Sequence, residues 1–473
     1  MNPPHPTSPR FDPSRRRFLR GMSCAAVGST GILSALAQLR VIAAVAGSSS
    51  ALRSAAVATD YKALVCLYLE GGNDGTNILI PSDVGGYAAY AKARSILAVE
   101  QKSLLPVSLR SFSDGHSYAL HPSMPELQRL FGQGKLGALG NVGTLVQPTT
   151  LAQYRAGAAL PPQLFSHSDQ ALQWQSSVPD RPFDSGWGGR LADLIDAFNG
   201  NHQISMSISA GGQNSFQVGQ NVNQFTVNPG GVQQLFTNGQ TLLDANEGPR
   251  GNAIKNVVAT APDNLLGAAF GNQLKSALDN TALLGSLLGS APALKTAFPG
   301  GSLADQLKMI ARLISLAPAL NLKRQVFFCH MFGYDTHTAQ VATHGPLLAE
   351  LSAALGAFYD ATVELGVANQ VTTFTASDFG RTYTANSDGS DHGWGNLQLV
   401  MGGAVKGGDI YGAMPSFAIG GPDDTGQGRW LPSTSVDEYS ATLASWFGVS
   451  ATDLPVVLPN IGRFAKPNLG FMG

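Results

Sequence analysis

Acidic and imidazole side chains follow three apolar runs of strand length in this sequence. Asp74 comes after the run 63–69, Asp335 and His337 after the run 325–329, and Asp378 after the run 371–375. Because parallel strands end at a common edge of a sheet, these side chains can meet there. Carboxylates mixed with imidazoles suit Zn, Mn or Fe, whereas carboxylates alone suit Mg or Ca. Each group alone is also typical of a solvated turn, but three at successive strand ends favour a metal site.

The third run begins the stretch 371–408, which we expect to lie near the ends of the other two strands. Asp378 is followed by Arg381, and a polar, Gly-rich loop then delivers Asp391 and His392 side by side. A second apolar strand is expected at 397–401. The plain alternative is an ordinary strand–loop–strand whose polar residues cap turns.

A hydroxyl-rich segment, 165–170 (FSHSDQ), predicts the start of a helix, with Ser166 or Ser168 as its N-cap. Capping is the commoner role of such a hydroxyl. It can also be a nucleophile, since the helix dipole and free N–H groups favour an anion at that end. Ser166, His392 and Asp335 would in principle make a triad, although no G-x-S-x-G, G-x-x-x-x-G-K-[ST] or G-x-G-x-x-G motif occurs.

The elements that must position these residues predict an α/β fold. The strand 325–329, the long helix 346–365 and the strand 371–375 form a right-handed βαβ unit, which places both strand ends on one edge. Unbroken apolar strands indicate burial on both faces, as in a parallel sheet. We therefore expect a doubly wound, mostly parallel sheet flanked by helices, in a single domain over 60–473.

One region departs from this pattern. Between about 200 and 262, apolar and polar residues alternate between Gly and Asn turns, as in SMSISAGG and NSFQVGQNVNQFTV. A period of two is typical of antiparallel strands. We expect a small β-rich insert that shapes access to the site.

The N-terminal segment carries an export pattern. The sequence S-R-R-R-F-L-R at 14–20 precedes a mildly apolar run from 21 to 39, and small-x-small sites follow at 44–46 and 56–58. This predicts a twin-arginine signal peptide over 1–46, with cleavage as late as 58, and a periplasmic or secreted protein that uses the twin-arginine export machinery. A basic tail before a core helix is the alternative.

Charge and composition bear on which classes of binding partner the protein can have. Charged residues make up 13% of the chain, and the first 46 residues hold six Arg and one Asp, so the rest has 24 basic and 30 acidic residues. A mildly acidic body without a basic stripe argues against nucleic acid. No later stretch has 18 unbroken apolar residues, so no transmembrane segment is expected in the mature chain. Cys66 and Cys329 lie in apolar runs, where buried thiols are the default.

Several motifs in order resemble the exported family catalogued as domain of unknown function 1501. They are LEGGNDGTNILIP, LFSHSDQALQW, GYDTHTAQ, TASDFGRT and DHGWGNLQLVMGGAVKGGDIYG, and together they span roughly 62–415. That family in turn resembles the alkaline phosphatase and sulfatase superfamily in fold and motif order.

The resemblance implies a two-metal site for phosphoryl or sulfuryl transfer. Asp74 would match the first-strand metal ligand, and Ser166, with His167 and Ser168 beside it, would match the nucleophile that caps a helix. One metal site would use Asp335, His337 and His392, and Asp378 would belong to the other. Arg381 would hold the anionic substrate, a role that suits its planar fork.

Two departures from the superfamily bear on this assignment. The spacing of Asp335 and His337 is shorter than usual there, and Phe379 follows Asp378 where a His is typical. The second site then lacks one ligand, so the sequence leaves open whether the chain binds one ion, two ions or none.

We expect an exported metal-dependent hydrolase that cleaves a small anionic ester, a phosphate or a sulfate. Its divalent metal would be Zn first, with Mn, Fe or Ca as alternatives. A second reading is a non-catalytic exported binding or assembly protein that keeps the fold with a degenerate metal site. A third is a metal-independent esterase that uses Ser166.

Overall fold

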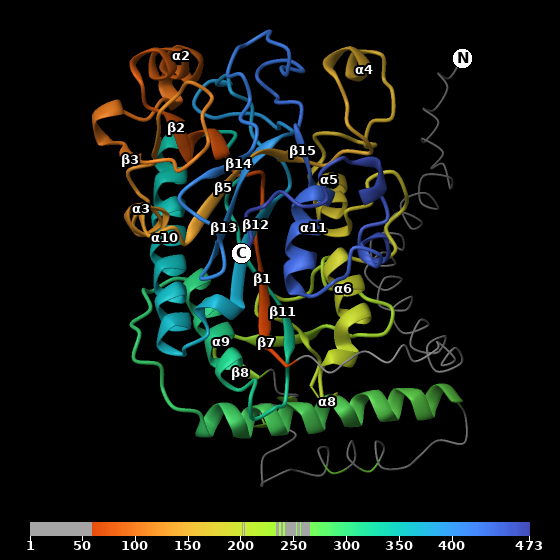
Figure 1. Cartoon of the computed structure of the whole chain (residues 1–473). Coiled ribbons are helices and arrows are strands. Elements are labelled where there is room, and N and C mark those ends of the chain that lie inside the picture. Colours follow the sequence, from red (N-terminus) through yellow and green to blue (C-terminus); the bar gives the residue numbers. More distant parts are fainter. Residues whose placement is uncertain are drawn as a thin grey trace, which may run out of the picture.

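A ten-stranded, mostly parallel sheet forms the centre of the computed structural model (Figure 1). The structure describes residues 59–200, 202, 204–232, 236–237, 240–241, 252, 256 and 265–473. The expected signal segment 1–46 lies outside these residues. Within them, no helix has both the length and the apolar character that a bilayer crossing needs.

Parallel pairing dominates the central sheet, as predicted. β13 is antiparallel to both of its neighbours and β8 to β7, and the other pairs are parallel. In sheet order the strands are β14 (Ile410–Gly412), β5 (Leu136–Gly143), β13 (Asn396–Gly402), β12 (Val371–Ser377), β1 (Lys62–Leu69), β11 (Arg324–Met331), β6 (Ser207–Ser209), β7 (Phe225–Asn228) and β8 (Gly231–Val232), with β15 (Thr434–Ser435) beside β5.

Helices cover both faces of this sheet (Figure 1). On one face lie α3 (Pro125–Gly132), α9 (Ser302–Ser315) and α10 (Gln340–Glu364), and on the other α5 (His167–Ser176), α6 (Trp187–Ile195) and α11 (Val436–Phe447). Alternate residues of β1 enter the two cores, Val65 and Leu67 the first, Leu64 and Cys66 the second. Burial on both faces explains why this strand is apolar without interruption.

The remaining elements surround these layers. A small antiparallel sheet joins β2 (Leu79–Pro81), β4 (Tyr118–Leu120) and β3 (Leu105–Val107), and a hairpin joins β9 (Phe236–Thr237) and β10 (Gln240–Thr241). The other helices are α2 (Val84–Arg94), α4 (Leu151–Arg155), α8 (Leu265–Ser290) and α12 (Leu454–Val457), with single 3₁₀ turns η1 (Gly75–Asn77), η2 (Ser95–Leu97), η3 (Gln101–Ser103), η4 (Asp196–Phe198), η5 (Ala368–Gln370) and η6 (Ile461–Arg463).

The antiparallel prediction for 200–262 is wrong for its first two strands. β6 pairs in parallel with β11, and β7 pairs in parallel with β6, so both extend the central sheet. The alternation in β6 comes from Ser207 and Ser209, which are fully buried on the face opposite Ile208. These buried serines therefore produced the alternating apolar and polar pattern that is typical of a strand with one face in solvent. Antiparallel pairing does occur in β7–β8 and β9–β10, and other parts of this region lie outside the described residues.

The predicted strand–helix–strand unit is β11, α10 and β12. β1 lies between the two strands and is parallel to both, so the carboxyl ends of all three strands share one edge, at the top of Figure 1. α10 begins at Gln340, six residues before the predicted start, and contains Pro346. The loops that carry the candidate residues therefore leave the sheet side by side.

Candidate metal centre

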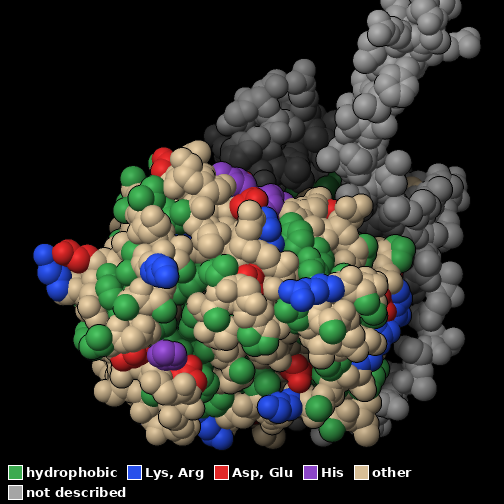
Figure 2. Space-filling view, turned by 90° about the horizontal axis from the view of Figure 1, so that it is seen from above, with side chains coloured by type: hydrophobic (Ala, Val, Ile, Leu, Met, Phe, Trp, Pro, Cys, Tyr) green, Lys and Arg blue, Asp and Glu red, His purple; other side chains and the backbone are tan. Residues whose placement is uncertain are grey.

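Four side chains come together at this edge of the sheet: His167, Asp335, His337 and His392. We call them the four-residue group. Asp335 and His337 lie in the loop after β11, His392 lies between β12 and β13, and His167 is the first residue of α5. One donor atom from each lies within 4.8 Å of all the others. Seen from above, histidine and acidic side chains adjoin on this end of the molecule (Figure 2).

Asp335 is the carboxylate among three imidazoles. Its Oδ1 lies 3.1 Å from His337 Nε2 and 3.5 Å from His392 Nε2, and its Oδ2 lies 3.5 Å from His167 Nε2. The Nε2 atoms of His337 and His392 are 2.8 Å apart. This donor set, nitrogen with one oxygen, is the one that Zn²⁺ takes in proteins.

Hydrogen bonds fix the tautomers of two of these imidazoles. His392 Nδ1 lies 2.7 Å from the carbonyl oxygen of Phe165, which can only accept, so Nδ1 carries the proton and Nε2 its lone pair. His167 Nδ1 lies 2.6 Å from Asp378 Oδ2, and its Nε2 is buried without a hydrogen-bond partner. Protein ligands to metals are commonly held in this way. The side chains present therefore fit a divalent metal.

Asp378 is not a member of the four-residue group but contacts one of its members, His167. One carboxylate oxygen binds His167, and the other accepts a hydrogen bond of 2.6 Å from the hydroxyl of Tyr68. The carboxylate is buried, and its hydrogen bond raises the pKa of His167 above the ordinary value. Asp378 is thus placed to orient His167.

Arg381 is buried and its guanidinium contacts protein atoms. Nη1 donates to Asp335 Oδ1 at 2.7 Å and to the carbonyl of Gly71 at 3.2 Å, while Nε and Nη2 reach the hydroxyl and carbonyl of Ser390. Burial by itself would raise the pKa of Asp335, but the hydrogen bond and charge of Arg381 bring that pKa below its usual value. Arg381 therefore keeps Asp335 ionised.

Burial raises the pKa of a carboxyl group but lowers that of an imidazole, as it does for His392. The lower pKa favours the neutral ring, which is the form that can bind a metal.

The turn after β1 needs glycine because two neighbours press against it. Gly71 has φ +112° and Gly72 has φ +80°. A Cβ on Gly71 would collide with the backbone of Asp335, and one on Gly72 would collide with the ring of Phe379. That ring is fully buried and lies 4.7 Å from the His167 ring and 4.6 Å from the His392 ring, centre to centre.

The structure does not bring Asp74 into the four-residue group. Its buried carboxylate forms an ion pair with Arg94 of α2 and accepts hydrogen bonds from Gln340 and Thr76, each at 2.5 Å. Burial would raise the pKa of Asp74, but the charge of Arg94 lowers it on balance. The first strand therefore places its acid in a separate buried network.

Ser166 occupies the predicted N-cap position of α5, with φ −93° and ψ 127°. Its hydroxyl donates to Asp169 Oδ2 at 2.5 Å and lies 3.2 Å from the hydroxyl of Ser168, instead of capping a backbone N–H. The carbonyl of the preceding residue, Phe165, accepts from His392. Ser166 therefore stands at the margin of the group.

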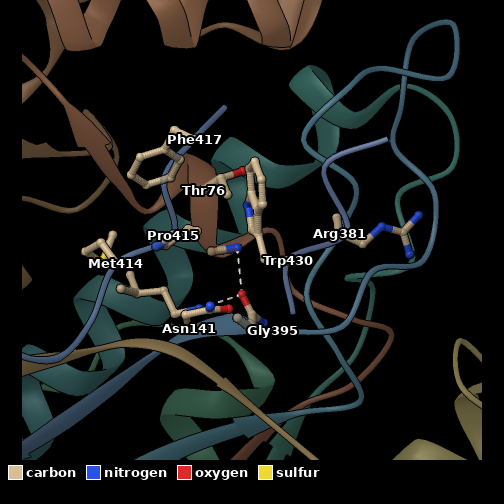
Figure 3. Close-up of a pocket in the computed structure, with 11 residues that line it drawn as sticks. Thr76, Asn141, Arg381, Gly395, Met414, Pro415, Phe417 and Trp430 are labelled. Atoms are coloured by element: carbon tan, nitrogen blue, oxygen red, sulfur yellow. Dashed lines mark hydrogen bonds between the residues drawn. The ribbon is translucent and has the colours of Figure 1, made fainter. Parts of the chain in front are cut away.

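Two cavities near this edge differ in size. One, of about 20 Å³, lies among Thr76, Asn141, Met414, Phe417 and Trp430 (Figure 3). The guanidinium of Arg381 points away from these residues in Figure 3. This space is close to that of a single water molecule, so it is too small for an ester. The other, of about 310 Å³, is lined in part by His167 and Asp378, and it has room for a small ligand.

Three of the predicted metal ligands therefore lie in one group: Asp335, His337 and His392. The fourth member, His167, was expected only as a neighbour of Ser166. The signal that could have found it is its place in the first turn of a helix that starts at the carboxyl edge, where an imidazole can face the acid that ends β12.

Solved structures with low sequence identity are similar to this chain. A sulfatase, PsFucS1, from Pseudoalteromonas sp. is 10% identical, with 89% of this chain and 72% of that chain covered and a TM-score of 0.35. The lipoteichoic acid synthase LtaP from Listeria monocytogenes is 9% identical, with coverages of 86% and 76% and a TM-score of 0.34. An alkaline phosphatase superfamily protein from Vibrio parahaemolyticus is 12% identical, with coverages of 89% and 77% and a TM-score of 0.35.

No curated protein matches the sequence. A family model does match, over residues 314–435, which include Asp335, His337, Asp378, Arg381 and His392 but not His167. The match confirms the resemblance over that segment: residues 314–435 match the model of the family described as "Protein of unknown function (DUF1501)".

Proposed function

We propose that this protein is a metal-dependent hydrolase of phosphate or sulfate esters. The observation that carries the proposal is the four-residue group, whose three imidazoles and one carboxylate offer donor atoms within 4.8 Å of one another. Such a set fits Zn²⁺ first and Mn or Fe next, and it fits Ca²⁺ poorly because Ca²⁺ takes oxygen ligands. One ion is proposed, held by His167, Asp335, His337 and His392.

A bound divalent ion would supply Lewis-acid stabilisation of charge on the ester oxygens. The chain supplies the orientation of the ligands: Asp378 holds His167, the carbonyl of Phe165 holds His392, and Arg381 holds Asp335. These contacts keep the donor atoms directed inward and reduce the reorganisation that binding requires.

Ser166 is the proposed nucleophile. Its hydroxyl already donates to Asp169, which can take the proton as the Ser166 oxygen bonds to phosphorus or sulfur. The ester bond breaks in the same step, and the leaving oxygen departs with the bonding electron pair. Water then hydrolyses the seryl ester. The N-terminus of α5 favours the negative charge that develops there.

A panel of aryl phosphate, phosphodiester and aryl sulfate esters, offered to the Zn²⁺-loaded protein, tests this proposal. Turnover of at least one ester is expected, with loss of activity in His392→Ala and a fall of about a thousandfold or more in Ser166→Ala. Ser103→Ala, which changes a hydroxyl on η3, is the control. Full activity of His392→Ala would contradict the proposal.

A second candidate function is a metal-holding binding or assembly protein without turnover. Two observations favour it. Phe379 packs its ring against His167 and His392 at the position expected to hold a ligand of a second ion. The guanidinium of Arg381 is already engaged by Asp335, Gly71 and Ser390 rather than open to an anion. Stoichiometric metal without turnover of any ester in the panel would favour this reading.

Export by the twin-arginine route to the periplasm or beyond is part of the proposal. Its support is the S-R-R-R-F-L-R pattern at 14–20, followed by a mildly apolar run. Replacing both Arg15 and Arg16 by Lys should leave the precursor in the cytoplasm, and cell fractionation measures this. Equal periplasmic yield of the variant and the parent protein would contradict it.

A further inference from the structure

The cavity of about 310 Å³ lies beside the four-residue group, because His167 and Asp378 are part of its wall. Its other walls come from the end of β1, from β11, from α5 along most of its length and from the loop 213–215. The lining residues that bear on its chemistry are Tyr68, Glu70, His167, Phe328, His330 and Asp378. An ester held at the group would extend into this space.

The described residues of this lining include two carboxylates, Glu70 and Asp378, and neither Lys nor Arg. Its other ionisable groups that bear on this charge are the imidazoles of His167 and His330. Asp378 is neutralised in part, since Tyr68 and His167 bind its two oxygens. Glu70 lies beside His330, with Oε2 3.6 Å from Nδ1.

His330 does not offset the charge of Glu70. Burial lowers the pKa of His330, so the ring is neutral near pH 7. Burial also raises the pKa of Glu70, and the nearby charge of Asp378 raises it further, while the charge of His167 lowers it. The Glu70 side chain keeps 45% of its surface exposed, and a ligand in the cavity can therefore reach it.

Two aromatic rings line the cavity together with these carboxylates. They are Phe328 and Tyr68, which are stacked with their ring centres 6.3 Å apart. A carboxylate with neighbouring aromatic faces is a favourable environment for an ammonium group.

We infer that this cavity binds the cationic, amine-bearing part of an ester whose anionic group lies at the four-residue group. Glu70 is the residue that selects for the amine, and a second anionic group on the ligand is excluded by the same carboxylate. The inference rests on the proposed function for the placement of the anionic group, and it adds the substrate class.

Three phosphonates that share an anionic head and cannot be hydrolysed test the inference: 3-aminopropylphosphonate, propylphosphonate and 3-phosphonopropanoate. Calorimetric titration into the Zn²⁺-loaded protein should rank the ammonium compound tightest and the carboxylate weakest, with roughly five- to tenfold between successive compounds. Glu70→Gln should reduce the whole spread to about twofold or less. Glu100→Gln, an exposed acid elsewhere, is the control and should leave the spread unchanged.

Equal affinities in the parent protein, an unchanged spread in Glu70→Gln, or binding of none of the three would each overturn the inference. The matching phosphate esters, assayed for turnover, separate it from the proposed hydrolase. Selective binding of the amine without any turnover removes the hydrolase and keeps the cavity assignment. Turnover of all three esters with equal kcat/KM, together with equal affinities of the phosphonates, keeps the hydrolase and removes the cavity assignment.

Discussion

Asp378 Oδ2 lies 2.6 Å from His167 Nδ1, so the acid that ends β12 holds the imidazole that begins α5. The two residues are 211 positions apart in the chain and meet because both elements end or begin at the carboxyl edge of the sheet. With its Nδ1 bound in this way, His167 directs a buried, unpartnered Nε2 toward Asp335.

Asp378→Asn tests this relationship. The amide keeps the shape of the side chain but removes the charge that orients His167. Affinity for Zn²⁺ should fall roughly ten- to a hundredfold, as for other residues that support a metal ligand, with little change in the fold. Competition with a chromophoric chelator measures it. Asp360→Asn, at an exposed ion pair with Arg129, is the control, and an equal affinity in Asp378→Asn would count against the assignment.

Arg94 is expected to matter for stability rather than for the metal. Its side chain and that of Asp74 are both fully buried and form an ion pair, so Arg94→Met leaves a buried carboxylate without its partner. The free energy of unfolding should fall by about 3–5 kcal/mol. Urea denaturation measures this.

The double variant Arg94→Met, Asp74→Asn separates the lost partner from lost packing. Removing the orphaned charge should restore part of the stability. If the double variant is as unstable as the single one, the ion pair is not the reason for the loss.

Asp437 predicts a specific dependence of stability on pH. It is buried in α11, and burial raises its pKa to about 8. In the unfolded chain this group loses its proton near pH 4, whereas the folded protein keeps it until about pH 8. The folded state binds more protons in between, so stability should fall as pH rises from about 4 to about 8.

Asp437→Asn removes that titration. The variant should be more stable than the parent protein at pH 8, and its stability should vary less between pH 4 and pH 8. Chemical denaturation at several pH values measures both, with the exposed Asp279→Asn as the control. The same pH profile in Asp437→Asn and the parent would show that Asp437 is not the group responsible.

The thiols of Cys66 and Cys329 should be unreactive in the folded protein. Both are free and buried, and burial raises the pKa of each above its ordinary value. Treatment of the native protein with a thiol reagent such as DTNB should modify neither, and denaturation should expose both. Peptide mapping assigns the modified residues, and rapid labelling of either one in the native protein would contradict the expected burial.

The strand ends were predictable because their signals are local. Unbroken apolar runs at β1, β11 and β12 and the turn residues after them indicate buried parallel strands, and these strands do end side by side. The pairing of β6 was predicted wrongly because Ser207 and Ser209 are buried, and the sequence alone does not distinguish a buried serine from an exposed one.

The composition of the candidate site was harder to predict. Asp335, His337 and His392 come together, but whether Asp74 joins them depends on Arg94, which α2 brings to the same place. Whether His167 joins the group depends on how α5 packs beside β12, where Asp378 binds its ring. Both depend on packing between segments that are far apart in the sequence. The predicted helix start at 165–170 places His167 at the edge of the sheet, but it does not show which acid its ring contacts.

Metal content is the most direct measure of the central claim, that His167, Asp335, His337 and His392 hold a divalent ion. Elemental analysis of the purified, folded protein should find about one ion per chain, reduced to a trace in His392→Ala and lost with a lower Tm after treatment with a chelator. Absence of stoichiometric metal, together with an unchanged Tm in chelator, would contradict the claim.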